Sequence, residues 1–218
     1  MTKKKSHKKY HKRRPKKKTK PTGVAGYGLI FMIVAAMFLA VGAIKNVSSP
    51  IFNTYQEADV NKEHQDFINK ILPEALEVQK KYNILTSITL SQSILESNWG
   101  QSELSSKYNN LFGVKASEVQ KGVNLSTTEY RSGVPETVTG RFRVYDSWDE
   151  SIEAHAILIA HGTDWNSQQY KEVIEADNYR DSAKGLSIDG YATDPAYAEK
   201  IIEIIEKYHL NKYDQKNN

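Results

Sequence analysis

The sequence predicts a mostly helical α+β domain with one small β-hairpin, preceded by a single transmembrane helix. Three observations lead to this fold class. Several segments repeat apolar residues at the three- and four-residue spacing of an amphipathic helix. Two short segments on either side of residue 134 alternate apolar and polar side chains, as strands do. Tyr27–Ile44 is an uncharged apolar run of 18 residues, which is long enough to cross a bilayer.

The charge distribution gives this apolar run an orientation. Residues 1–20 contain 12 Lys or Arg and no acidic residue. From Lys45 onward, 18 basic residues stand against 26 acidic ones, a formal charge of −8. The positive-inside rule therefore places the basic tail in the cytoplasm and the acidic part outside the cell membrane. A cleaved signal peptide, ending near Val41-Gly42-Ala43, is the alternative. A basic tail could also bind nucleic acid. Because this tail directly adjoins the predicted membrane span, a role as topology signal is the simpler explanation of its charge.

These features divide the chain into five parts. We expect a basic cytoplasmic tail over residues 1–26, a transmembrane helix over 27–44, a linker over 45–57, one catalytic domain over 58–213 and a polar tail over 214–218. A domain of this size can form its own core without disulfides.

Three helices are expected before the hairpin. The first has an apolar face of Phe67, Ile68, Ile71 and Leu72, and Pro73 lies in the first turn of a second helix that ends at Tyr82. The third is Thr86–Asn98, with Thr86 as its N-cap and Gly100 just past its end. Asn109–Lys115 predicts a turn that leads into an extended segment.

The hairpin and two further helices follow. The predicted strands are Thr127–Tyr130 and Val138–Val144, joined by a longer loop over Arg131–Glu136. Ser147-Trp148-Asp149-Glu150 is a capping box that opens a helix ended by Gly162. Asp194-Pro195 is expected to cap the last helix. The inner faces of these two helices are, in order, Ile152, His155, Ala156 and Ile159, then Ala198, Ile201, Ile202, Ile205 and Tyr208.

Glu96 is the residue that most strongly suggests chemistry. It lies in the neutral, mostly apolar segment Ser91–Gly100, and no Lys or Arg is within helical reach of it. Burial without a positive partner raises the pKa of a carboxyl group, and glycosidases need such a protonated acid for the leaving sugar oxygen. A Glu at the solvent edge of a core helix would give the same spacing and is the alternative.

Other kinds of catalytic site find little support. The chain has no cysteine, no His-Glu-x-x-His and no Gly-x-Ser-x-Gly, which argues against thiolate, zinc and serine hydrolase chemistry. We therefore expect no metal and no organic cofactor. The hairpin supplies two further carboxylates, Glu129 and Glu136, whose distance from Glu96 the sequence does not give.

Five motifs follow one another in a characteristic order: Ser91–Gly100, Asn109–Lys115, Thr127–Tyr130, Phe142–Ile152 and Gly190–Tyr197. Together they resemble the bacterial peptidoglycan N-acetylglucosaminidases of glycoside hydrolase family 73, the flagellar-muramidase and autolysin type, over about residues 62–211. The resemblance implies a lysozyme-like fold with a groove between a helical lobe and the hairpin. It also implies cleavage of the β-1,4 bond after N-acetylglucosamine in peptidoglycan glycan strands. Our leading hypothesis is a membrane-anchored, endo-acting enzyme of this kind, although the sequence does not decide between endo- and exo-action.

The resemblance also implies roles for individual residues. Glu96 matches the general acid, Glu129 the hairpin acid proposed in some members as the base, and Tyr191 an aromatic near the reaction centre. Substrate assistance by the acetamido group of the sugar is an alternative to Glu129. We expect contacts with the glycan from Gln92, Trp99, Asn110, Phe112, Tyr130 and Tyr145. The expected partners are glycan strands and, through residues 27–44, the membrane, with no nucleic acid.

Two other functions compete with this one. A muramidase or lytic transglycosylase would share the lysozyme-like helix and its single acid. A non-catalytic wall-binding scaffold would keep the fold without using Glu96.

Overall fold

A computed structural model describes the backbone of residues 50–131 and 134–214 and the side chains of residues 61–127 and 136–214. The expected cytoplasmic tail and transmembrane helix, residues 1–44, lie outside these ranges. Within the described ranges, no helix is both long enough and apolar enough to cross a membrane.

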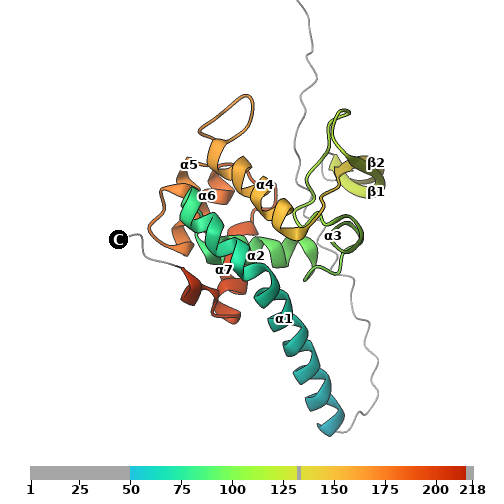
Figure 1. The fold of residues 1–218 in the computed structure, drawn as a ribbon, viewed down its shortest axis with the longest axis vertical. Coiled ribbons are helices and arrows are strands. Elements are labelled where there is room, and N and C mark those ends of the chain that lie inside the picture. Colours follow the sequence, from blue (N-terminus) through green and yellow to red (C-terminus); the bar gives the residue numbers. More distant parts are fainter. Residues whose placement is uncertain (1–49, 132–133, 215–218) are drawn as a thin grey trace, which may run out of the picture.

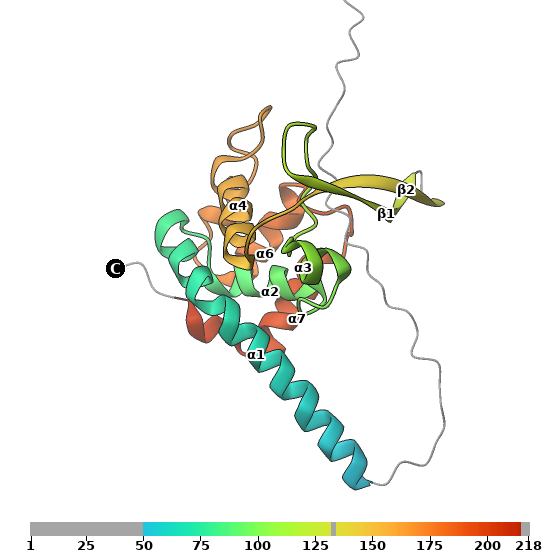
Figure 2. The same ribbon diagram turned by 45° about the vertical axis from the view of Figure 1, so that its right-hand side comes forward.

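The described residues form helices around a central helix, with one hairpin at the edge (Figure 1). The elements are α1 (Pro50–Tyr82), α2 (Thr86–Ser97), α3 (Glu103–Tyr108), β1 (Gly122–Arg131), β2 (Val134–Arg143), α4 (Trp148–His161), α5 (Lys171–Ile174), α6 (Tyr179–Ile188), α7 (Tyr197–Lys207) and the 3₁₀ helix η1 (Leu210–Tyr213). Turning the molecule shows the hairpin projecting from the helical body, with the first part of α1 extending away from it (Figure 2). The expected mostly helical α+β class with one small hairpin is confirmed.

Helix α1 runs without interruption past Pro73, so the prediction of two separate helices is wrong. Proline lacks an amide hydrogen and removes one backbone hydrogen bond from a helix interior. Burial on both sides of it compensates, because Phe67 and Ile71 before Pro73 and Ala75 and Val78 after it all lie in one core. Residues 50–57, expected as part of a linker, also belong to α1.

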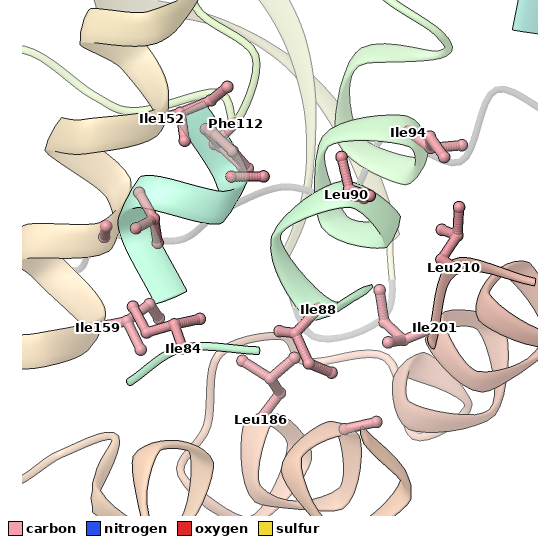
Figure 3. Packing of buried hydrophobic residues seen from close by; sticks show 14 of the residues in the cluster. Ile84, Ile88, Leu90, Ile94, Phe112, Ile152, Ile159, Leu186, Ile201 and Leu210 are labelled. Carbon is pink, nitrogen blue, oxygen red and sulfur yellow. The ribbon is translucent and has the colours of Figure 1, made fainter. Parts of the chain in front are cut away.

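Helix α2 is the central element of the fold. It contacts α1, α6, α7 and η1, and Figure 3 shows its residue Ile88 directed toward Leu186 and Ile201. Small polar residues line the other faces of α2 and are also buried. Some of their hydroxyls donate to carbonyls of the preceding turn, as Ser93 Oγ does to Thr89 O (2.7 Å) and Ser97 Oγ to Ser93 O (2.5 Å). Because these two hydroxyls find acceptors within the helix, they can be buried where other helices pack on α2.

Two side chains from outside α2 accept hydrogen bonds from the amides and hydroxyls of its first turn. Thr86 is its first residue and Leu85 the N-cap, so the prediction of Thr86 as the cap is off by one position. Gln79 Oε1 accepts from the amide (2.9 Å) and hydroxyl (2.6 Å) of Thr86. The carboxylate of Asp214 accepts from the amide and hydroxyl of Ser87, both at 2.8 Å. Local sequence does not reveal a cap that comes from the far end of the chain.

The hairpin is longer and more tightly connected than predicted. Each strand has ten residues, and the antiparallel register pairs Arg131 with Val134 and Glu129 with Glu136. The predicted long loop over Arg131–Glu136 is therefore wrong, because most of its residues belong to the strands. The Gly and Pro in this segment suggested a loop, but pairing between the strands outweighs these local preferences.

The predicted starts and ends of the later helices are largely confirmed. Ser147 Oγ accepts from the Glu150 amide (3.1 Å) at the start of α4, and Gly162 ends that helix with φ +69°. The N-cap of α7 is Ala196, while Asp194 forms the preceding turn by accepting from the Ala196 amide (2.9 Å). Helices α3, α5, α6 and η1 were not predicted; they are short, with at most ten residues each.

Candidate active site

Glu96 lies in the last turn of α2, at a sharply defined helix end. The next three residues after Ser97 all have positive φ: Asn98 (+49°), Trp99 (+60°) and Gly100 (+73°). A Cβ atom on Gly100 would lie 2.6 Å from Cη2 of Trp148, so only glycine fits there. Ser97 Oγ accepts from the Gly100 amide at 2.7 Å. This turn fixes the direction in which the chain leaves α2 just after Glu96.

The carboxyl group of Glu96 has the properties expected of a general acid. Its side chain is only partly exposed, and Tyr197 Oη donates a hydrogen bond to Oε1 at 2.8 Å. Burial raises the pKa of Glu96 to about 7, although the hydrogen bond from Tyr197 and the positive charge of Lys200 both lower it. The sequence predicted a raised pKa from the absence of a cation on the same helix. The structure adds a cation from α7, and desolvation still dominates.

Tyr197 contacts Glu96 but is not among the site residues predicted from the sequence. It is the first residue of α7, is fully buried, and lies 101 positions after Glu96. Gln92, one helical turn before Glu96, donates from Nε2 to Tyr197 Oη at 3.1 Å. The only available signal was the position of Tyr197 at the end of the motif Gly190–Tyr197.

Tyr191 lies behind this pair, next to a buried histidine. Its ring centroid is 5.4 Å from that of Tyr197, and its hydroxyl is 2.9 Å from His155 Nε2. Burial lowers the pKa of His155 to about 3, so this imidazole is neutral at physiological pH. Burial and the nearby Glu96 raise the pKa of Tyr191 well above its usual value. The ring of Phe112 stacks on the ring of His155, with 3.9 Å between the two centroids.

The structure thus brings three of the predicted site residues close together, Glu96, Gln92 and Tyr191, and places Phe112 behind His155. Their roles in catalysis stay predictions. Phe112 is 1% exposed and its ring is held against His155. Direct contact of Phe112 with a glycan stays a prediction.

Three further expected glycan-contacting residues have structural partners of their own. Trp99 stacks on His64 of α1 at 3.6 Å and meets the edges of Phe67 and Tyr208. Asn110 uses Nδ2 and Oδ1 to bind backbone groups of Val114 and Arg143. Tyr145 is buried beneath the guanidinium of Arg143, 4.7 Å from the ring centroid, and burial raises the pKa of Tyr145 to about 12. These contacts support the loops around the site, and glycan binding by the three residues stays a prediction.

The second expected carboxylate is described only through its backbone. Glu129 pairs with Glu136 across the two strands of the hairpin. The side chains of Glu129 and Tyr130 lie outside the described residues, whereas that of Glu136 is exposed.

Known proteins share this arrangement of sequence and fold. A family model described as "Glucosaminidase: Mannosyl-glycoprotein endo-beta-N-acetylglucosaminidase" matches residues 72–210. The exo-glucosaminidase LytG of Bacillus subtilis is 43% identical over 189 residues, which are 87% of this chain and 66% of that protein. A probable N-acetylmuramidase of Lactococcus lactis is 35% identical over 68% of this chain and 34% of its own length. The chain thus spans two thirds or less of these relatives.

Solved structures give the same result for the fold. The catalytic domain of the autolysin Auto from Listeria monocytogenes superimposes with a TM-score of 0.66 at 36% identity, covering 78% of this chain and all of that domain. A C-terminally truncated glycoside hydrolase domain of FlgJ from Salmonella typhimurium gives a TM-score of 0.55 at 31% identity, covering 67% of this chain and 97% of that one. The chain therefore belongs to the glucosaminidase family, the glycoside hydrolase family that its motifs resemble.

Proposed function

We propose that this protein is a cell-wall hydrolase that cleaves the β-1,4 bond after N-acetylglucosamine in peptidoglycan, with Glu96 as general acid. The observation that supports this most is the carboxyl of Glu96, partly exposed at the end of a buried helix, with a pKa raised to about 7. A carboxyl group that still holds a proton near neutral pH and remains reachable from solvent is suited to protonating a leaving oxygen.

In the proposed first step, Glu96 transfers its proton to the glycosidic oxygen as the bond between that oxygen and the anomeric carbon breaks. The bonding electron pair goes to the departing oxygen, and positive charge develops on the sugar as an oxocarbenium-like species. Glu96 is then a carboxylate, which the Tyr197 hydroxyl stabilises by donating to Oε1. Lys200 adds a favourable positive charge to the same carboxylate.

In the proposed second step, water adds to the anomeric carbon and loses a proton. Glu129 is our candidate for the base that receives it, with participation of the acetamido oxygen of the sugar as the alternative. Glu136 provides a matched control, because it faces Glu129 across the hairpin. Glu129→Gln is expected to lose activity and Glu136→Gln to retain it. Equal activity of the two variants would remove the hairpin base from the mechanism.

The direct test compares wild type and Glu96→Gln for lysis of purified peptidoglycan. Removal of a general acid costs roughly 10²–10⁴-fold in rate. We expect Glu96→Gln to fold and to clear almost none of the peptidoglycan in a zymogram. Clearing at the wild-type rate would contradict the proposal.

A second candidate function is N-acetylmuramidase activity, because a relative in Lactococcus lactis bears that name. Mass spectrometry of the products separates the two activities. A glucosaminidase leaves N-acetylglucosamine at the new reducing end, whereas a muramidase leaves N-acetylmuramic acid. Anhydro ends would instead identify a lytic transglycosylase.

The position of cleavage along the strand is also a proposal. The family description names an endo-enzyme, and the Bacillus subtilis relative is named an exo-glucosaminidase. We propose endo-cleavage, which shortens the mean glycan length early in digestion. Release of small saccharides while the remaining strands stay long would indicate exo-action.

We further propose that residues 27–44 anchor the enzyme in the membrane, with the N-terminus in the cytoplasm and the catalytic domain outside. The supporting observation is the basic tail followed by an uncharged run of 18 apolar residues. Protease added to whole cells without their wall should digest the catalytic domain and spare the tail. Recovery of the protein in the culture medium, lacking residues 1–43, would indicate a cleaved signal peptide.

A further inference from the structure

We propose that Tyr197, oriented by Gln92, is a positioning residue that fixes Glu96 for proton donation from Oε2. This inference rests on the proposed function of Glu96 as the general acid. It assigns a role to a residue that never needs to touch the substrate. The supporting geometry is a chain of two hydrogen bonds, from Gln92 to Tyr197 and from Tyr197 to Glu96.

The chemistry of Gln92, Tyr197 and Glu96 decides which group donates in each of the two hydrogen bonds. The Nε2 group of an amide can only donate, so the Tyr197 oxygen accepts from Gln92 at 3.1 Å. The Tyr197 hydroxyl has two further neighbours, the hydroxyl of Tyr191 and Glu96 Oε1, and its hydrogen is directed to Glu96 Oε1 at 2.8 Å. A hydrogen bond of this kind to a carboxyl oxygen is stronger and shorter when the carboxyl ionises.

The same pair of hydrogen bonds decides which carboxyl oxygen of Glu96 carries the acidic proton. Oε1 already accepts from Tyr197, so the proton of neutral Glu96 belongs on Oε2. Among the residues that the structure describes, Oε2 has no hydrogen-bonding partner, and the Glu96 side chain is partly exposed. The proton is therefore held on the oxygen that has no described protein partner, in a side chain that is partly exposed.

Tyr197 is itself held firmly, as a positioning residue must be. Both Tyr197 and Gln92 are fully buried. The Tyr197 ring packs against Tyr191 at 5.4 Å between centroids, and its backbone amide donates to Asp194 O at 3.1 Å. Gln92 and Glu96 are four residues apart on α2, so one helical face supplies both hydrogen-bond partners of the tyrosine.

The other charged and titratable groups around Glu96 do not replace this hydrogen bond. Lys200 on α7 acts through its charge and is held by Asp194, with 2.6 Å between Nζ and Oδ2. Tyr191, in the segment before α7, bonds to His155 of α4, which burial keeps neutral, and to the hydroxyl of Tyr197. Among the described side chains, Tyr197 is thus the hydrogen-bond donor of Glu96.

The test compares Tyr197→Phe with Tyr82→Phe in the full-length protein. Tyr82 is a matched control because its hydroxyl also donates to a glutamate, Glu153 Oε1 at 2.6 Å, on α4. The rate is measured as a function of pH on soluble peptidoglycan fragments, and the Glu96 carboxyl is titrated by ¹³C NMR.

Tyr197→Phe removes a donor that favours the ionised carboxyl, so the pKa of Glu96 should rise. The decline of activity at alkaline pH should therefore move upward by about one pH unit. We expect kcat to fall roughly tenfold, with a nearly unchanged KM, because the acid is less well oriented. Tyr82→Phe should match wild type in all these measurements. Gln92→Met, which removes the donor to Tyr197, should raise the pKa of Glu96 in the same direction but by less.

Each outcome bears on one of the two proposals. An active wild type, with a Tyr197→Phe pH profile and Glu96 titration that both superimpose on it, would overturn the positioning role and leave the proposed function intact. A wild type without activity on peptidoglycan would refute the proposed function. The NMR titration would still decide whether Tyr197 controls the proton of Glu96, and if Tyr197→Phe does not fold, Gln92→Met decides it.

Discussion

Replacing Glu96 by Gln should remove activity and at the same time stabilise the protein at alkaline pH. In the unfolded chain this carboxyl has its ordinary pKa of 4.5, whereas in the folded chain burial raises the pKa to about 7. Below pH 4.5 Glu96 is neutral in both states and the substitution changes little. Above pH 7 the folded protein must hold an ionised carboxylate that burial disfavours, and the amide of Gln removes that cost.

The size of the effect follows from the two pKa values. The native state binds the proton more tightly than the unfolded state, so the contribution of Glu96 to stability is present below pH 4.5 and is lost as pH rises through 7. At about 1.4 kcal/mol per pH unit, the full loss is roughly 3 kcal/mol. The unfolding free energy of Glu96→Gln should therefore exceed that of wild type by up to this amount at alkaline pH and by little at acid pH.

Urea unfolding of wild type and Glu96→Gln at pH 4.5 and pH 8.5 measures this gain. Glu118→Gln is the matched control, since Glu118 is exposed in the loop before β1 and its substitution should alter stability equally little at both pH values. Equal stabilities of wild type and Glu96→Gln at pH 8.5, or a gain confined to acid pH, would refute the argument that burial controls this carboxyl.

Three further predictions concern groups around the site. Lys200→Met removes a positive charge that favours ionised Glu96, so the alkaline decline of activity should move to higher pH, by less than in Tyr197→Phe; a downward shift would contradict this. Asp214→Ala removes the cap from Ser87 and should lower the unfolding free energy by about 1 kcal/mol in urea titrations, and an unchanged midpoint would show that the cap is dispensable. Because burial lowers the pKa of His155 to about 3, wild-type stability should fall as pH drops from 6.5 toward 3, and His155→Gln should weaken that fall.

The sequence was most informative where one residue decides a local structure. The capping box at Ser147 and the glycine at position 162 correctly predicted both ends of α4. The neutral surroundings of Glu96 correctly predicted the direction of its pKa shift. At α4 the determining groups are neighbours in sequence, so a local pattern is sufficient. For Glu96 the pattern predicted burial in an apolar helix, and this burial is the main cause of the raised pKa.

Local sequence patterns did not predict contacts between residues that are far apart in the sequence. Asp214 caps α2 from 127 positions away, and Tyr197 reaches Glu96 across 101 positions. Pro73 suggested a helix start, but burial of apolar residues on both sides of it keeps α1 continuous. These outcomes depend on tertiary packing, which no window of neighbouring residues specifies.

The central claim is that Glu96 retains a proton near neutral pH in the folded enzyme. A ¹³C NMR titration of its carboxyl carbon, assigned by comparison with Glu96→Gln, measures this directly. We predict a midpoint at about pH 7 in the wild-type protein. A midpoint near pH 4.5 would mean that the carboxyl is well solvated, and it would contradict the assignment of Glu96 as the proton donor.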